Sequence, residues 1–239
     1  MLGRLVILGV FFLGCKEFIL GSHPIQSSQS SEPSAFWKLG LNAGKKGGGS
    51  SDIAASRLSN SKTIRLKGLL VGCEGEATPI SYNLMASHLL LVLDGVTDIT
   101  NIGSCLRVAE SAGVDAVMLR PHLPAERGLR RIIWRASSGA SQLVPLVHSP
   151  NLRNTIRALK GAGHTIIGSD HEAPSLFYDV PLRFPLTIIV GSEEKGVAGS
   201  IKKECHVLTR IPMWGTISSL NVAVASSVML FEIRRRLLF

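Results

Sequence analysis

The stretch from Leu89 to Leu119, LLLVLDGVTDITNIGSCLRVAESAGVDAVML, determines the fold. It opens on Leu89 to Leu93, a continuous apolar run ending in Asp94-Gly95, which is typical of a strand buried on both faces of a parallel sheet. Asn101 to Gly113 has helical spacing and stops at the glycine, and Val114 to Leu119 predicts a second buried strand. Two buried strands joined by a helix predict an α/β fold.

The same alternation continues on both sides of this stretch. Upstream, Leu66 to Gly72 predicts a short strand, followed by a polar connector containing Gly75 and Pro79. Strands alternating with helices at this spacing predict an α/β sandwich, with a mostly parallel sheet and helices on both faces. Downstream we expect helices at 127–140, 151–160, 198–203 and about 218–238, and strands at 144–147, 164–168, 186–190 and 206–211.

Composition limits the partners of the chain. With 239 residues and 45% hydrophobic content, it can bury one catalytic-sized core plus an appendage. A formal net charge of +9 attracts polyanions, of which nucleic acid is the commonest, although anionic membranes and acidic substrates also fit. The four cysteines form no C-x-x-C pair, so we expect no disulfide framework and no metal site.

The N-terminal region has a different composition. Arg4 precedes the apolar run Leu5 to Cys15, which is too short to span a bilayer but fits the core of a signal sequence. Residues 21–62 are rich in serine and glycine, and Glu32 and Asp52 are their only acids. This region resembles a linker or an organellar transit segment, and a wrongly assigned start codon explains it equally well.

The first candidate motif is Asn101-Ile102-Gly103-Ser104-Cys105-Leu106-Arg107, which follows a strand and opens a helix. Its glycine permits a tight turn, and Asn101 and Arg107 lie where strand ends meet helix starts, the usual ligand position in open α/β sheets. Taken alone, the motif is equally compatible with a capping asparagine and a surface arginine.

The second motif, Gly191-Ser192-Glu193-Glu194-Lys195-Gly196, follows the strand at 186–190. It offers backbone amides, carbonyls and a carboxylate at one edge of the sheet. It also suits a tight turn in which an acid favours the following helix N-terminus. The order of residues excludes a phosphate-binding P-loop.

The third motif is Ile211-Pro212-Met213, followed by Ser218-Ser219-Leu220-Asn221 and an apolar helix. Pro212 fixes the exit from the strand, and Ser218 is a candidate N-cap. The Asn221 amide lies just inside an otherwise apolar helix, so it must find a partner, and a ligand is one candidate.

Together, in this order and each at a strand end, the three motifs resemble the catalytic domain of SpoU-type (TrmH-like) RNA 2′-O-ribose methyltransferases of the SPOUT superfamily. The matching segments are LVLDGVTDITNIGSCLRVAESAGVDAV, IIVGSEEKGV and IPMWGTISSLNVAVASSVMLFE. LDGVTD, RASSGASQLVP and SSLNVAVA most resemble the subgroup that modifies guanosine in large-subunit ribosomal RNA. Arg65-Leu66-Lys67-Gly68 stands where that subgroup carries a His-Gln-Gly signature, a departure that bears on the ribosomal target.

The resemblance implies a C-terminal trefoil knot that binds S-adenosylmethionine, and a homodimer with the active site near the interface. It divides the chain into an extension at 1–62, a strand and connector at 63–88 left from an N-terminal substrate-binding domain, and a catalytic domain at 89–239. Cofactor contacts fall on Gly191, Ile211, Met213 and Leu220.

By motif match, Arg107 corresponds to the family arginine proposed to help deprotonate the ribose hydroxyl. The residues that would orient it, the RNA and the cofactor are Asn101, Glu193, Ser219 and Asn221. Since a free guanidinium stays protonated, we favour electrostatic stabilisation of the developing alkoxide over a role as general base.

A basic helix is a candidate RNA-binding surface. One helical face is expected to carry Arg127, Arg130, Arg131, Trp134 and Arg135. Arginines with an interleaved aromatic suit phosphate contact and base stacking. The alternative is a solvated basic face with Trp134 packed underneath.

The predicted function is S-adenosylmethionine-dependent methylation of a ribose 2′-hydroxyl, of a guanosine in large-subunit ribosomal RNA. The alternatives are a transfer RNA 2′-O-methyltransferase and a non-catalytic RNA-binding or ribosome-assembly protein with the same fold. The partners expected are structured RNA and a second copy of the chain, with no stable membrane partner. The location expected is an RNA-containing compartment: a mitochondrion or plastid if the extension is a transit segment, otherwise the cytoplasm.

Overall fold

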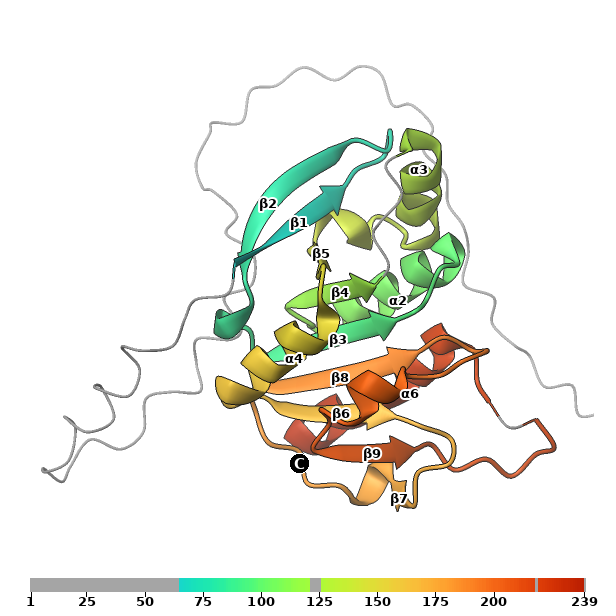
Figure 1. Ribbon diagram of the computed structural model, residues 1–239. Coiled ribbons are helices and arrows are strands. Elements are labelled where there is room, and N and C mark those ends of the chain that lie inside the picture. Colours follow the sequence, from blue (N-terminus) through green and yellow to red (C-terminus); the bar gives the residue numbers. More distant parts are fainter. Residues whose placement is uncertain (1–64, 121–125, 218, 239) are drawn as a thin grey trace, which may run out of the picture. The chain divides into compact units, whose positions relative to one another are not determined.

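A nine-stranded sheet runs through the part of the chain that the computed structural model describes, residues 65–120, 126–217 and 219–238 (Figure 1). These residues belong to a unit that spans residues 51–239. The strands follow the order β2-β1-β5-β4-β3-β8-β6-β9-β7. Their bounds are β1 Arg65–Val71, β2 Ala77–Asn83, β3 Leu89–Asp94, β4 Ala116–Arg120, β5 Leu146–His148, β6 Thr165–Ser169, β7 Ser175–Leu176, β8 Leu186–Gly191 and β9 Val207–Arg210.

Most of this sheet is parallel, as the sequence predicts. Every neighbouring pair from β5 to β7 is parallel, and only β1 pairs antiparallel, with β2 on one side and β5 on the other. In the register of the central strands, Asp94 lies between Arg120 of β4 and Gly191 of β8. The carboxyl ends of these three strands therefore meet at one edge of the sheet.

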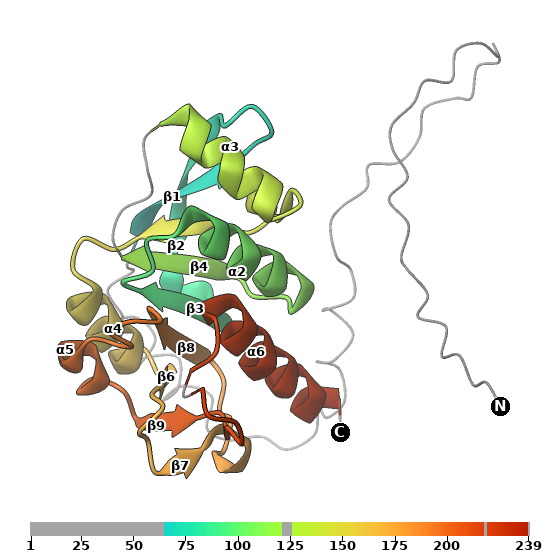
Figure 2. The same cartoon turned by 90° about the vertical axis from the view of Figure 1, so that its right-hand side faces the viewer.

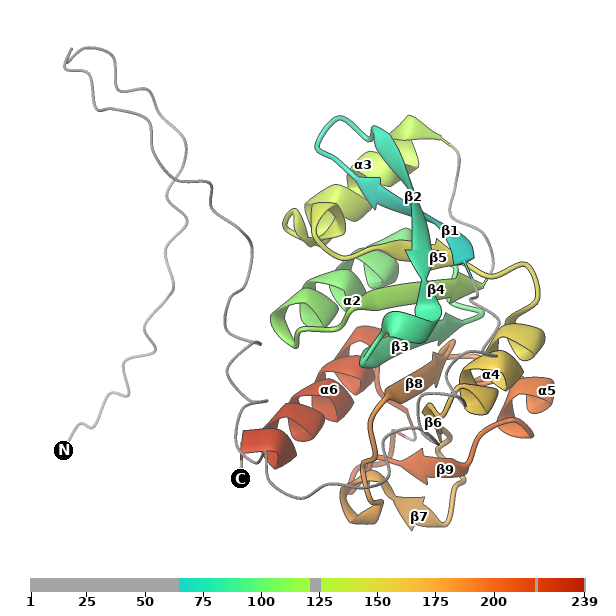
Figure 3. The same cartoon turned by 90° about the vertical axis from the view of Figure 1, so that its left-hand side faces the viewer.

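Helices cover both faces of the sheet, which confirms the predicted layers. The helices α2 (Ile99–Ser111), α3 (Arg127–Ala136) and α6 (Val222–Leu238) lie on one face (Figure 2). The helices α4 (Leu152–Gly161) and α5 (Gly199–Lys202) lie on the other (Figure 3). Short 3₁₀ turns occupy Leu84–Ala86, Ala140–Gln142 and Phe177–Asp179.

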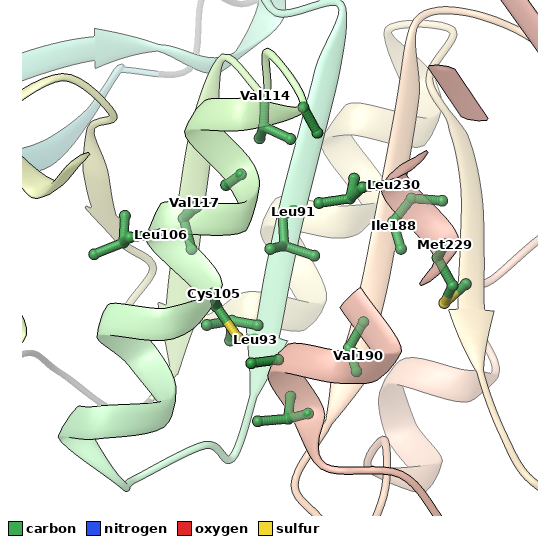
Figure 4. Packing of buried hydrophobic residues seen from close by; sticks show 14 of the residues in the cluster. Leu91, Leu93, Cys105, Leu106, Val114, Val117, Ile188, Val190, Met229 and Leu230 are labelled. Atoms are coloured by element: carbon green, nitrogen blue, oxygen red, sulfur yellow. The ribbon is translucent and has the colours of Figure 1, made fainter. Parts of the chain in front are cut away.

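The apolar run of β3 joins the two layers because its side chains alternate between them. Leu91 and Leu93 pack in the cluster that faces α2 and α6 (Figure 4). Leu90 and Val92 pack in the second cluster, which includes residues of α4 and α5. All of these side chains are fully buried, and each is worth about 1.5–3 kcal/mol of hydrophobic stabilisation.

Helix ends differ from the expected bounds for local reasons. Helix α2 begins before Asn101 because the Asp98 carboxylate caps it, accepting from Thr100 N at 2.7 Å and Asn101 N at 3.2 Å. Helix α3 stops at Ala136 rather than Ala140 because Ser138 and Gly139 take left-handed φ angles of 52° and 88°.

The polar connector expected after the first strand is wrong, because residues 77–83 form the strand β2. Pro79 is tolerated there since β2 is an edge strand, which can accommodate a residue without a backbone N–H. The strand β7 and the 3₁₀ turns had no sequence signal. The α6 start at Val222 replaces the one expected near Ser218, which lies outside the described residues.

None of the helices within residues 65–120, 126–217 and 219–238 is long and apolar enough to cross a membrane. Across these same ranges, no group of three His, Cys, Asp or Glu side chains is placed to hold a metal ion. The extension at 1–62 falls outside the described ranges.

Candidate functional site

Three predicted residues from separate motifs meet at the carboxyl edge of the sheet. The Asn101 side chain, at the start of α2, donates to Glu193 Oε1 at 3.0 Å. The Asn221 amide, directly before α6, donates to the same oxygen at 2.9 Å and to Asn101 Oδ1 at 3.0 Å. The structure therefore joins all three motifs through a carboxylate and two amides.

The start of α6 supplies the remaining contacts of this cluster. The Val222 backbone N–H donates to Glu193 Oε1 at 3.3 Å, and the Ala223 N–H donates to Asn221 Oδ1 at 2.9 Å. Asn221 thus caps α6 instead of lying inside it, which corrects the expected helix start. A carboxylate at this position is also favoured by the helix dipole.

The loop after β8 holds Glu193 in place, and its path depends on Gly191. A Cβ at Gly191 would lie 2.0 Å from the carbonyl carbon of Gly196 and 2.2 Å from Val197 N. The loop is closed by Gly196 N donating to Ser192 O at 2.8 Å, and Ser192 N donates to Asp94 O at 3.1 Å. Only glycine fits where the loop turns back against its own start.

A cavity of about 340 Å³ opens beside this loop. Its lining includes the four predicted cofactor residues Gly191, Ile211, Met213 and Leu220. Glu193 and Ser219 line it as well. Asp170, Lys202 and Arg210, which no motif indicated, also line it. Asp170 and Lys202 form an ion pair at 2.6 Å, and burial opposes but does not outweigh the lysine contact that lowers the pKa of Asp170.

Arg107 does not join the cluster within one chain. It is exposed on α2 and is absent from the cavity lining, whereas Asn101 on the same helix points toward α6. Six residues at about 100° each place the two side chains roughly 120° apart around the helix axis. Neither residue is in the cavity lining, and Asn101 is connected to it through its hydrogen bond to Glu193.

All of the predicted RNA-binding residues lie on α3. Arg127, Arg131 and Arg135 are exposed, and Arg130 is partly buried. Trp134 packs against the hydrophobic cluster of the α2 and α6 face, and its indole nitrogen is buried. One side of the ring is therefore packed against the core, as in the alternative interpretation of this helix.

Asp94 is a charged residue of this edge to which the motifs gave no role. Its side chain is 1% exposed, and Oδ1 accepts from Arg120 Nε at 2.8 Å and from a terminal Arg120 nitrogen at 2.6 Å. Oδ2 accepts from Ala198 N at 2.9 Å, directly before α5. The signal was present in the sequence, since an acid that ends an entirely apolar buried strand must be paired.

Cys105 of the first motif lies between α2 and α6, where its thiol is 3.9 Å from the Ser226 hydroxyl. Burial raises the pKa of Cys105 to about 12, with a smaller opposing contribution from Ser226. A thiol that stays protonated is a poor nucleophile, so Cys105 is a packing residue of the motif.

Comparison with known proteins identifies relatives of this arrangement. The model of the SpoU rRNA Methylase family matches residues 88–231. Over 148 residues the chain is 41% identical to the 23S rRNA (guanosine-2′-O-)-methyltransferase RlmB of Pseudomonas aeruginosa, which covers 62% of this chain and 59% of that protein. It is 38% identical over 186 residues to RlmB of Ralstonia nicotianae, covering 77% and 69% of the two proteins.

Solved structures agree with these relatives. A crystal structure of an RNA 2′-O ribose methyltransferase superposes with a TM-score of 0.60 at 26% identity, over 66% of this chain and 60% of that one. The AdoMet-bound rRNA methyltransferase from Sinorhizobium meliloti gives 0.57 at 29% identity, over 63% and 57%. The family match covers more than half of the chain, and the motifs that carry the cluster all fall inside it. This chain belongs to the SpoU rRNA methylase family.

Proposed function

We propose that this chain is an S-adenosylmethionine-dependent RNA methyltransferase that acts on a ribose 2′-hydroxyl, of a guanosine in large-subunit ribosomal RNA. The observation that carries the proposal is the Asn101, Glu193 and Asn221 cluster at the rim of a cavity lined by the second and third motifs. The names of the relatives, which are 23S rRNA guanosine methyltransferases, support the substrate.

The residues of the cavity fit the cofactor. The 191–196 loop and the residues around Ile211 and Leu220 present main-chain groups and apolar side chains, which suit an adenosine. Glu193 places a carboxylate at the rim, which favours a cationic group nearby. When bound, S-adenosylmethionine supplies an electrophilic methyl group on a sulfonium.

The chain's own residues orient the acceptor. Glu193 Oε1 accepts from two side-chain amides and one backbone N–H, so its position is determined by α2 and α6 together. The Ser219 side chain at the cavity is a candidate for holding the ribose hydroxyl in line with the methyl group. Arg107 would stabilise the developing alkoxide, since a guanidinium is a donor and not a base.

A homodimer would bring Arg107 to the site, because one chain alone leaves it outside the cavity. The exposed side of α6 carries Val224, Phe231 and Leu238 at seven-residue spacing, 48%, 48% and 78% exposed. An apolar stripe of this kind suits a second copy of the helix. The variant Phe231→Glu tests this proposal. We expect light scattering to show a monomer in place of a dimer, and methyl transfer to be abolished.

We propose the trefoil knot as the path of the C-terminal segment. Strand β9 lies on the far side of β6 from β8, yet α6 returns to pack on α2 and β8 across the opposite face from α5. Residues Ile211, Met213, Ser219 and Leu220 of this connection line the same cavity as the 191–196 loop, which supports a path close to that loop.

The exposed arginines of α3, Arg127, Arg131 and Arg135, are proposed RNA contacts through phosphates.

The curated relatives are bacterial proteins, which favours a cytoplasmic location over an organelle. The 63–88 segment is proposed to remain from a substrate-binding domain.

The deciding experiment is transfer of labelled methyl from S-adenosylmethionine to unmodified ribosomal and transfer RNA, followed by nucleoside analysis. We expect 2′-O-methylguanosine in ribosomal RNA, and a loss of about 10²- to 10³-fold in Arg107→Ala. Label in transfer RNA would establish the first alternative. Folded protein that binds RNA and transfers nothing to either would establish the non-catalytic alternative.

A further inference from the structure

Two arginines one turn apart on α4 share a single carboxylate oxygen. Arg153 Nε and Arg157 Nε each donate to Glu204 Oε1 at 2.8 Å. Hydrogen bonds from Arg157 and Arg153 hold the pKa of Glu204 below its usual value, so it stays ionised at neutral pH. The carboxylate is 11% exposed, whereas the two arginine side chains are 43% and 53% exposed.

The terminal nitrogens of both guanidinium groups are left for another partner. Within the described ranges, the hydrogen bonds of Arg153 and Arg157 side chains run only through Nε. Arg235 shows the contrasting case, because its Nε and a terminal nitrogen bind both oxygens of Glu232 at 2.8 and 2.9 Å. A guanidinium held at Nε with its outer edge open is pre-oriented for a bidentate anion such as phosphate.

The surroundings of the pair are basic and adjoin the cavity. Lys160 Nζ donates to Glu204 O at 3.3 Å, and Lys202 and Lys203 lie on and directly after α5. Three cations, Arg153, Arg157 and Lys160, contact the single carboxylate residue Glu204, which leaves a net charge of +2 there, and Lys202 is paired with Asp170. Lys202 also lines the cavity, and α4 contacts α5, so the arginine pair lies close to the proposed cofactor site.

We infer that Arg153 and Arg157 form a phosphate clamp, which binds the backbone of the RNA strand flanking the target ribose. The inference rests on the proposed function and adds a second RNA surface, on the face of the sheet opposite α3. The α4 clamp reads no base and contributes charge and register.

The salt dependence of RNA binding tests the clamp. Binding of a 20-nucleotide single-stranded RNA is followed by fluorescence anisotropy across a salt series, because each phosphate contact contributes about −0.7 to the slope of log K against log salt. We expect Arg157→Gln to reduce the slope by about 0.7, and Arg153→Gln/Arg157→Gln by about 1.4. The matched control is Arg183→Gln, which removes one exposed positive charge ahead of β8 and should leave the slope unchanged.

Glu204→Gln separates the clamp from a structural brace between α4 and α5. With a clamp, this variant binds the RNA as tightly as wild type or more tightly, since a negative charge is removed and both arginines remain. Equal slopes for Arg157→Gln and Arg183→Gln, or weaker RNA binding by Glu204→Gln, would overturn the inference. Calorimetry with S-adenosylhomocysteine reports on the proposed function separately: if the wild type fails to bind it, the function fails whatever the salt slopes show.

Discussion

Asp94 and Glu193 are carboxylates at the ends of two neighbouring strands, β3 and β8, and they differ in every contact. Asp94 is buried and binds the guanidinium of Arg120 and the Ala198 N–H. Glu193 is exposed and binds only neutral donors, from Asn101, Asn221 and Val222. One edge of the sheet thus carries a carboxylate whose charge is neutralised and one whose charge is available to a ligand.

The largest expected effect is on stability, from Asp94→Ala. The change leaves the Ala198 N–H and the buried part of Arg120 without their partner, and breaking a buried pair costs about 3–5 kcal/mol. We expect a loss near the lower limit, because Arg120 is 44% exposed and can reach water. Urea unfolding measures it, and a loss below about 1 kcal/mol would remove the distinction between the two carboxylates.

Gly191→Ala should have the next largest effect on stability, because Gly191 lies between the two carboxylates. The added methyl meets backbone atoms at 2.0–2.3 Å, so the 191–197 loop must move. Overpacking of this kind costs about 1–3 kcal/mol, and displaced loop atoms should weaken S-adenosylhomocysteine binding in calorimetry. Gly199→Ala is the control, since a Cβ there meets nothing within 4 Å.

Asn221→Ala tests the contribution of a neutral donor to Glu193. It removes the cap of α6 and two hydrogen bonds of the cluster, with an expected loss of about 1 kcal/mol in unfolding free energy. Asn221→Asp should retain the cap yet place a second carboxylate against Glu193, which lowers activity more than stability. If the two variants lose activity equally with equal stability loss, Asn221 serves only the helix.

Glu232 tests whether pairing with arginine at the protein surface stabilises a carboxylate as the buried pair of Asp94 does. Hydrogen bonds from Arg235 and then Arg236 lower the pKa of Glu232 to about 2. A depressed folded-state pKa contributes stability above the unfolded value near 4.5, and this is lost as pH falls toward about 2. Arg235 is 60% exposed, so solvent screening limits the contribution to about 1 kcal/mol or less. Acid unfolding of Glu232→Gln should lack this dependence between those pH values.

Glu193→Gln should change stability least, by less than about 0.5 kcal/mol, since a glutamine oxygen accepts the same three donors. Methyl transfer should nevertheless fall by about tenfold or more, because the charge at the cavity rim is gone. A variant with full activity would show that the carboxylate serves only to connect α2 and α6.

The motifs located the pieces of this site but not their contacts. The buried strands were predictable because β3 and β8 carry nearly continuous apolar runs, with no alternation of apolar and polar residues. Asn101 lies 92 residues from Glu193 and 120 from Asn221, so their hydrogen bonds depend on the sheet order, which periodicity does not encode. Helix geometry gives the angle between Arg107 and Asn101, but only the packing of α2 shows which of them faces α6. Trp134 was ambiguous because a tryptophan satisfies both a buried and an exposed face.

Gly103 does not form the tight turn expected from the sequence but lies inside α2, where it lets α3 pack closely. A Cβ there would lie 2.5 Å from Ala136 Cβ and 2.9 Å from Ile133 O, so α2 and α3 touch backbone to backbone. With no side chain between them to reorient, a push on one helix is passed to the other. We therefore expect a displacement of α3, for example when its arginines bind a ligand, to move α2. The Asn101 side chain lies on the same helix as Gly103 and would pass this movement to the Glu193 carboxylate.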